Sequence, residues 1–497
     1  MRRGCAGRAR VQPGGPQPFT AFGVRPDCTP LSAVGSGNVL ASPAAHRQGD
    51  AMFTRREILK ASALATAAAH AGSATLLGGQ GDTGDVVDPT TPVTTRPFME
   101  SMPIPPVKTP AATGPDCWQT VSGGVRNPLQ AAHQQDSLTV PWGVPQKAYD
   151  MRVRKAKWSF HPSLGESTVF GFDGIFPGPT FIERYGEPVI VRIHNDIPRD
   201  HVGFGVPSIS SHLHNAHTAS ESDGNPNNYF DSGEYWDNHY PNILPGTITG
   251  GVTDPREALA TLWYHDHRHD FTAQNVYAGL AGFYLLYDDD DCGDESNSLG
   301  FRLPSGKYDV PMMFADKIFR SDGEMVYNFF NTDGILGDRF TVNGKVQPYF
   351  NVTRRKYRFR LLDASPARFY AFALSDGSAL YHIANDGNLF ERSIPRNVVW
   401  AGPAERQDVI IDFSKYKNGQ KLYLLNLAEQ TDGRKPTGDL FSLRSAPKLV
   451  EFRVKGTADD RSVLPSWDPN VVSLREQPPI DPSQVAVRRL FVFDRRQ

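Results

Sequence analysis

Short runs of β-branched and aromatic residues, interrupted by glycine and proline, recur along most of this chain. They are dense from about residue 138 to residue 287, and again from about residue 301 to residue 456. Short runs at regular spacing, with turn residues between them, are typical of the strands of a β-sandwich. The acidic run Asp288–Asp291 separates the two dense regions. We therefore predict an all-β protein with two strand-rich domains, at residues 138–290 and 301–456.

The two regions share an order of turns and strands. In the first, the glycine- and proline-rich residues 171–180 are followed by the apolar run 188–193. In the second, residues 342–349 combine Asn-Gly with a proline, and the strand-like run 357–362 follows. Each segment has the order glycine turn, proline, strand, turn, strand. Self-similarity of this kind indicates a repeated unit, so we expect two copies of one β-sandwich.

The segments that flank these two regions differ from them in composition and length. Residues 75–137 are rich in threonine, proline and glycine, which is typical of an extended arm. Residues 457–497 number 41. Because domains rarely fall below about 50 residues, this segment is too short for a third copy.

The N-terminal region resembles an export signal. Thr54-Arg55-Arg56 precedes an uncharged, alanine-rich run, and twin arginines before such a run resemble a Tat signal. We assign residues 52–74 to this signal, with Met52 as the initiator. Residues 1–51 are then an upstream extension outside the native protein. The signal predicts a periplasmic, cell-envelope or extracellular location.

Two histidine pairs carry the chemistry. His212-Leu213-His214 and His265-Asp266-His267 both have His-x-His spacing in strand-like surroundings. On a strand, residues two apart point to the same face, so each pair can aim two imidazoles at one point. Two such strands side by side would make a four-imidazole site. Imidazole suits copper, zinc, iron and nickel, so the pattern alone leaves the metal open.

The overall composition gives no indication of a nucleic-acid partner or of a membrane-spanning helix. The chain has 52 basic and 54 acidic residues, a formal net charge of −2, so no nucleic-acid partner is indicated. No apolar run is long enough to span a membrane as a helix. The oligomeric state is not indicated by any of these features.

The residues around the histidine pairs resemble those of multicopper oxidases. Ser211-His212-Leu213-His214 followed by Ser222-Asp223-Gly224 resembles the first copper motif of that family. Residues 262–267, Leu-Trp-Tyr-His-Asp-His, resemble the second motif closely. Residues 340–345 and 401–406 resemble signatures of the family's middle domain. The similarity is to the laccase, bilirubin oxidase and phenoxazinone synthase type.

The resemblance implies tandem cupredoxin-like, Greek-key β-sandwiches that bind copper. By this similarity His212 is a type 2 copper ligand, and His214, His265 and His267 are type 3 ligands. Asp223 matches an acidic residue near the cluster that helps to deliver protons. The implied reaction oxidises a phenol, aromatic amine, bilirubin-like pigment or metal ion by one-electron steps and reduces O2 to water.

One departure from the family concerns its third domain. That domain supplies His-x-x-His-x-His and His-Cys-His motifs, and no histidine or cysteine follows residue 456 here. A type 1 copper site needs a cysteine thiolate and two histidines, so the sequence lacks its ligands. We expect residues 457–497 to be the start of a truncated third domain, from a truncated or frameshifted reading frame or a decayed relic. Catalysis by this chain alone would then be incomplete.

Two other enzymes and a binding scaffold are the alternatives to a multicopper oxidase. Four histidines could hold Zn²⁺ in a hydrolase with Asp223 as the base, but the residues around the pairs argue against it. A two-domain copper nitrite reductase is excluded by the missing cysteine. A non-catalytic exported cupredoxin scaffold is the remaining alternative, and copper content would distinguish it from an oxidase.

Overall fold

The computed structural model describes residues 88–128 except 115 and 122, then 146–244, 254–465, 474–476 and 481–492. The twin-arginine segment and the upstream extension therefore lie outside the described residues. Strands dominate the described part, which contains a single α-helix, α3 (Thr272–Ala278). No helix within these ranges is long and apolar enough to cross a membrane.

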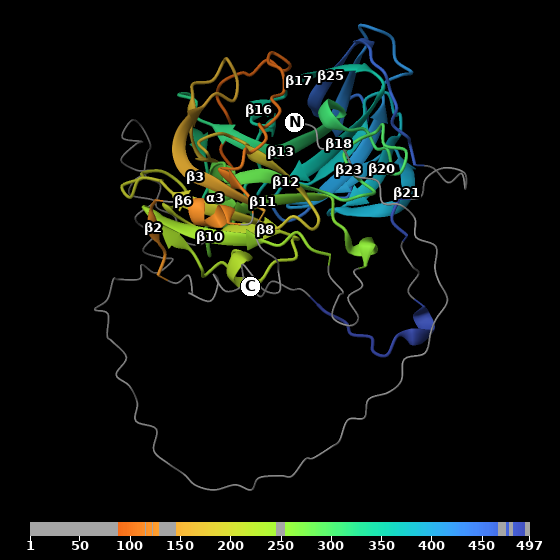
Figure 1. The fold of residues 1–497 in the computed structure, drawn as a ribbon. Helices are drawn as coiled ribbons and strands as arrows, with labels where there is room; N and C mark the ends of the chain where they lie inside the picture. The colour runs from red at the N-terminus through yellow and green to blue at the C-terminus, as the bar shows by residue number, and fades with distance from the viewer. Residues whose placement is uncertain are drawn as a thin grey trace, which may run out of the picture. The chain divides into compact units, whose positions relative to one another are not determined.

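The first strand-rich region folds into two sheets that enclose an apolar core (Figure 1). Within the described residues, a six-stranded sheet has the order β1-β3-β6-β10-β2, with β4 paired to β3. A four-stranded sheet has the order β5-β12-β11-β8. A short pair is formed by β7 (Ser208–Ile209) and β9 (Phe230–Asp231). The sheet strands are β1 (Ala112–Thr113), β2 (Val125–Arg126), β3 (Lys147–Trp158), β4 (Ser167–Phe172), β5 (Gly178–Arg184), β6 (Val189–Asn195), β8 (Ser211–His214), β10 (Glu234–Tyr240), β11 (Thr261–Asp266) and β12 (Ala281–Tyr287).

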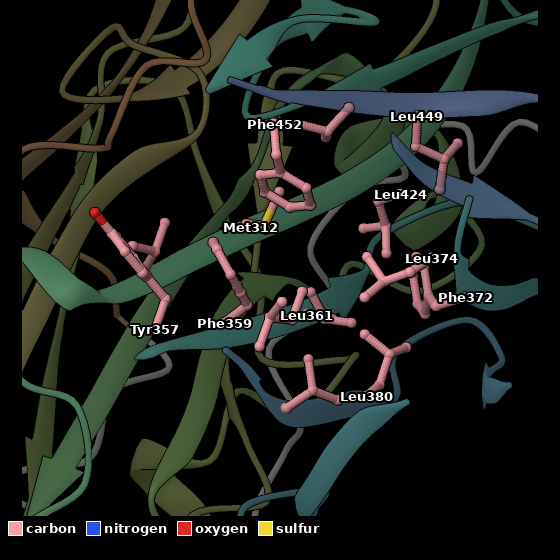
Figure 2. Close-up of a cluster of buried hydrophobic side chains, with 14 of the residues drawn as sticks. Met312, Tyr357, Phe359, Leu361, Phe372, Leu374, Leu380, Leu424, Leu449 and Phe452 are labelled. Atoms are coloured by element: carbon pink, nitrogen blue, oxygen red, sulfur yellow. The ribbon is translucent and has the colours of Figure 1, made fainter. Parts of the chain in front are cut away.

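The second region forms a similar sandwich. In the described part, an eight-stranded sheet has the order β16-β15-β13-β18-β23-β20-β21 with β14 on β13, and a five-stranded sheet has the order β17-β25-β24-β19-β22. Figure 2 shows part of the core between them, where the rings of Phe359 and Phe452 lie with their centroids 5.2 Å apart. The strands are β13 (Asp309–Phe319), β14 (Met325–Val326), β15 (Arg339–Val342), β16 (Lys345–Val346), β17 (Tyr349–Arg354), β18 (Lys356–Asp363), β19 (Tyr370–Leu374), β20 (Leu380–Asn385), β21 (Asn388–Arg396), β22 (Val399–Ala401), β23 (Arg406–Asp412), β24 (Lys421–Asn426) and β25 (Lys448–Thr457).

The strand pairings repeat from one sandwich to the other. In the first, β3 runs parallel to β6 and β5 runs parallel to β12. In the second, β13 runs parallel to β18 and β17 runs parallel to β25. The antiparallel chain β8-β11-β12 likewise corresponds to β19-β24-β25. The predicted all-β sandwich fold is confirmed, and the repeat seen in the sequence is present in the pairings.

The N-terminal arm is paired to both sandwiches. Ser101 forms a parallel bridge with Tyr349 of β17, and Val107 forms one with Thr180 of β5. Both partner strands lie at the edge of their sheets, where unpaired backbone groups otherwise invite association with other chains. Because β5 and β17 are equivalent strands, the arm covers the same edge in both copies. The segment predicted as an extended arm therefore adds backbone hydrogen bonds that its composition did not indicate.

The two sandwiches share a buried apolar contact. Trp263, Phe283 and Leu285, from β11 and β12, belong to one cluster with Met313 and Phe319 of β13. Strand β11, which carries one histidine pair, therefore has one face packed against the second sandwich. Residues 485–492 form no strand with other described residues. The expectation that residues 457–497 begin a third domain remains a prediction.

Candidate metal centre

The two histidine pairs lie on neighbouring antiparallel strands. His212 of β8 is opposite His265 of β11, and His214 is opposite Trp263. Leu213, between the first two histidines, points the other way into the core of the first sandwich. His267 follows the end of β11, and its backbone N–H donates to Ser210 O at 2.6 Å. The structure thus brings all four imidazoles to one side of the same sheet.

The ring nitrogens approach one another closely. Nδ1 of His214 lies 3.2 Å from Nε2 of His265. Potential ligand nitrogens of His212, His214 and His265 all lie within 4.8 Å of one another. The ring of His267 stacks on that of His212 with centroids 4.7 Å apart. The space among the rings is therefore lined by nitrogen donors at separations that metal ions can bridge.

Three of the imidazoles are oriented by backbone carbonyl oxygens. Nδ1 of His212 donates to Asp223 O, Nδ1 of His265 donates to Asp266 O at 2.7 Å, and Nδ1 of His267 donates to Gly224 O at 2.8 Å. A neutral imidazole that donates from Nδ1 keeps its lone pair on Nε2. Carbonyl acceptors of this kind fix the tautomer of metal-binding histidines.

Three of the four imidazoles are held neutral by their surroundings. Burial, together with the nearby Arg406 charge, lowers the pKa of His214 to about 3. Burial also places the pKa of His265 well below its usual value and lowers that of His267. Neutral imidazole is the form that binds a metal ion. These three side chains are therefore ready to coordinate at neutral pH without first losing a proton.

The predicted acid, Asp223, lies at the rim of the cluster. Its Oδ1 is 3.5 Å from Nδ1 of His212, and its side chain is 47% exposed. The neighbouring His212 side chain lowers the pKa of this carboxyl group, so it is ionised at neutral pH. Asp223 therefore connects solvent with the imidazole cluster and is placed to accept a proton.

Asp266 is a residue that the sequence interpretation treated only as a spacer. Its buried carboxylate accepts hydrogen bonds from the backbone N–H groups of Ser210 and Arg268, both at 3.0 Å, and from Asn275 Nδ2 at 3.1 Å. Burial raises the pKa of Asp266 to about 7. These contacts fix the backbone between His265 and His267. In the sequence, the only indication of a role for Asp266 is its place between His265 and His267.

Gly224 has no room for a side chain. Its φ is +76°, and a Cβ would lie 2.3 Å from Ser211 O and 2.6 Å from His212 Cα. We expect Gly224→Ala to displace the His212 backbone and to lower the free energy of unfolding by about 1–3 kcal/mol, measured by chemical denaturation. Gly186→Ala is the control, because Gly186 also has positive φ but nothing lies within 4 Å of the added Cβ. Equal losses in both variants would contradict the steric explanation.

Comparison with known proteins identifies the family. A family profile for multicopper oxidases matches residues 152–291, which include both histidine pairs. The laccase of Bacillus stratosphericus is 31% identical over 386 residues, covering 70% of this chain and 69% of that protein. The chain belongs to the multicopper oxidase family. The family resemblance inferred from the sequence motifs is confirmed, and copper is the metal that the family uses.

Other relatives agree with this assignment. The laccase of Bacillus subtilis (strain 168) is 33% identical over 340 residues, covering 62% of this multicopper oxidase. The chain spans 61% of the length of that relative. Among solved structures, a variant of the McoA multicopper oxidase from Aquifex aeolicus superimposes with a TM-score of 0.56. It is 24% identical and covers 78% of this chain and 70% of its own, which supports the fold.

Proposed function

We propose that this multicopper oxidase couples one-electron oxidation of a phenol, aromatic amine, bilirubin-like pigment or metal ion to four-electron reduction of O2 to water. In this proposal His212, His214, His265 and His267 supply half of an O2-reducing copper cluster. One observation carries it: four imidazoles converge from two paired strands, and three have Nδ1 bound to a carbonyl oxygen. Neutral imidazoles oriented in this way fit copper.

The family resemblance gives each ligand a role in this proposal. His212 would hold a type 2 copper, and His214, His265 and His267 would hold type 3 coppers. His214 directs Nδ1 at its neighbour His265, so we expect it to bind through Nδ1 and the other three through Nε2. Bound copper would supply the one-electron redox steps that amino-acid side chains cannot.

Asp223 has the proton-handling role in the proposal. Reduction of one O2 to water consumes four protons, and a positioned carboxylate can transfer them by general acid–base steps. The Asp223 carboxylate is partly exposed and lies beside the His212 ring. It would take up a proton from solvent at Oδ1 and pass it to the cluster. The sequence contains no cysteine–histidine motif for a type 1 copper site. The four histidines and Asp223 therefore do not provide the site at which electrons enter from the reducing substrate.

Copper binding tests the proposal directly. We expect the purified chain to bind Cu(II) in a competition titration, and His265→Ala to weaken binding by at least about tenfold. His269→Ala is the matched control, since its side chain is 58% exposed and it has no place in the cluster. Its affinity should equal that of the wild type. Unchanged affinity in His265→Ala would overturn the assignment of the site.

A second measurement separates an oxidase from a copper-binding scaffold. Oxygen consumption by the copper-loaded chain is followed with a phenolic reductant, and peroxide is assayed in parallel. Four electrons consumed per O2, with no peroxide, supports the oxidase. Because the chain lacks the type 1 ligands, copper binding without oxygen consumption would favour the scaffold only if it persists when a small reductant supplies electrons to the bound copper directly.

The proposed location is outside the cytoplasm. The twin-arginine segment at residues 54–60 supports Tat-dependent export, which moves proteins that have already folded. Cell fractionation followed by N-terminal sequencing of the processed protein tests this proposal. Recovery of the unprocessed chain from the cytoplasm alone would contradict it.

A further inference from the structure

A turn of the second sandwich lies against the strand that carries His212 and His214. Asp386, between β20 and β21, has a φ of +49°. Its carbonyl oxygen accepts a hydrogen bond from Asn215 Nδ2 at 2.8 Å, and Asn215 directly follows His214. We call residues 386–388 the Asp386 turn. The end of β8 is thus attached to a different sandwich by a side-chain amide.

The same turn is attached to the strand that carries His265. Ala260 N–H donates to Gly387 O at 2.8 Å, and Leu259 forms an antiparallel bridge with Asn388. Ala260 immediately precedes β11. The Asp386 turn therefore contacts the chain at the end of β8 and at the start of β11.

Arg406 links these contacts into one unit. Its side chain is 2% exposed. Nε donates to Thr261 O at 3.2 Å, and Nη2 donates to Asp386 O at 3.0 Å. Nη1 lies 3.0 Å from Asp386 Oδ1. One planar guanidinium therefore joins β11 to the Asp386 turn, and the Asp386 carbonyl is shared with Asn215.

The residue after His214 is suited to this contact. Asn215 has a φ of +68°, a left-handed conformation in which asparagine is several-fold enriched among non-glycine residues. Glycine would support the same backbone but has no side-chain amide. In this chain, Asn215 therefore combines the left-handed backbone with a hydrogen bond to the second sandwich.

We propose that Arg406, Asn215 and the Asp386 turn are positioning elements for the copper ligands. They hold the end of β8 and the start of β11 at a fixed separation, and so fix where His214 and His265 face each other. This inference rests on the proposed function, because it assigns the elements to copper binding. A fixed donor geometry lowers the cost of organising the site when a metal binds.

Arg406→Lys and Asn215→Gly test this proposal. Lysine keeps the positive charge of Arg406 but lacks the several N–H donors of the planar guanidinium. Glycine keeps the left-handed backbone of Asn215 but lacks the side-chain amide. Each variant should bind Cu(II) about tenfold more weakly than the wild type, the lower end of the range for residues that support metal ligands. The bound Cu(II) should also show an altered hyperfine splitting in its electron paramagnetic resonance spectrum, because that splitting reports ligand geometry.

Two control variants distinguish positioning from general structural support. Arg368→Lys alters another buried arginine, whose Nε binds Asp316 Oδ2 at 2.9 Å and which has no contact with β8 or β11. Asp270→Gly replaces an exposed residue with a φ of +63°. Both controls should keep the wild-type copper affinity and spectrum, at temperatures where every variant is folded by circular dichroism.

The outcomes separate this proposal from the proposed function. If the wild-type chain does not bind copper, the proposed function fails. If the wild type binds copper and Arg406→Lys and Asn215→Gly bind it with unchanged affinity and spectrum, the positioning proposal alone is overturned. Equal losses in the Arg368→Lys control would also overturn it, because the effect would then be a general loss of structure. A double Arg406→Lys, Asn215→Gly variant should lose less than the product of the two single effects, because both act through Asp386.

Discussion

Arg358→Met is expected to lower the free energy of unfolding by about 3–5 kcal/mol, the usual loss when one partner of a buried ion pair is removed. The Arg358 side chain is 0% exposed. Its Nη2 lies 2.6 Å from Asp408 Oδ2, and its Nη1 lies 2.7 Å from Asp291 Oδ2. The variant leaves both buried carboxylates without this cation. Chemical denaturation measures the loss.

The effect of this variant extends to the copper-binding strand. Asp408 also accepts a hydrogen bond from Thr261 Oγ1 at 2.8 Å, and Thr261 is the first residue of β11. Arg256→Met is the control, since Arg256 pairs with Asp254 on the surface, where water screens ion pairs and they contribute little to stability. Adding Asp408→Asn to Arg358→Met should recover part of the loss, because one unpaired charge is removed. A loss that is unchanged in the double variant would point to packing rather than charge.

Lys317→Met is expected to stabilise the protein at pH 7 and to remove a rise in stability with pH. Nζ of Lys317 donates to Tyr277 O at 2.6 Å and lies 4.1 Å from the centre of the Tyr277 ring. Burial lowers the pKa of Lys317 to about 7, against the opposing charge of Asp316. Methionine has a similar length and carries no charge to desolvate.

The direction of the pH effect follows from where the proton is bound. Between about pH 7 and the ordinary lysine pKa of 10.5, the unfolded chain holds a proton on Lys317 that the folded chain lacks. Stability therefore rises with pH in this window. The advantage of Lys317→Met should shrink by about 3 kcal/mol from pH 7 to pH 10, at about 1.4 kcal/mol per pKa unit. Thermal unfolding over this range measures it.

A matched variant separates this effect from other titrations. Lys345 is partly buried and pairs with Glu100 at 3.0 Å, so Lys345→Met removes a lysine whose charge has a carboxylate partner. Its stability should run parallel to that of the wild type across the same pH range. A Lys317→Met advantage that stays constant with pH would show that the lysine is not neutral in the folded protein.

The sequence was sufficient for the fold and the imidazole cluster because both depend on short-range patterns. Strand periodicity places His212 and His214 on one face of β8, and the pairing of β8 with β11 places His265 on the same side of the sheet. His267 is different, since it lies just beyond the strand and is placed by its backbone bond to Ser210. The position of His267 agrees with the His-x-His pattern, but it is set by a backbone hydrogen bond that residue spacing does not predict.

Long-range contacts could not be predicted from the sequence. Asn215 and Asp386 are 171 positions apart, and no local pattern connects them. Arg406 was noted only as part of a family signature, although it contacts both β11 and the Asp386 turn. Buried polar groups of this kind depend on which chain segments meet, and pattern analysis does not supply that information.

The second sandwich shows how the same fold can lack the metal centre. Its strands β19 and β24 correspond to β8 and β11. On the side of the sheet away from the core they carry Ala371, Ala373 and Leu425, which form a separate apolar cluster. The sandwich pattern survives this difference, because it depends on the inward-facing residues. The imidazoles are therefore an addition to the fold of the first copy and not a requirement of it.

The paired arm also sets an order of events during synthesis. Asp88 accepts a hydrogen bond from the backbone of Leu336, 248 positions later, and Thr91 pairs with Asp338. The ribosome must therefore add a further length of chain greater than an entire sandwich before Asp88 and Thr91 have these partners. Closing so long a loop is slow relative to local strand pairing. The residues around Asp88 are thus among the last of the described arm to reach their native contacts, whereas Val107 can pair with Thr180 of β5 as soon as the first sandwich is made.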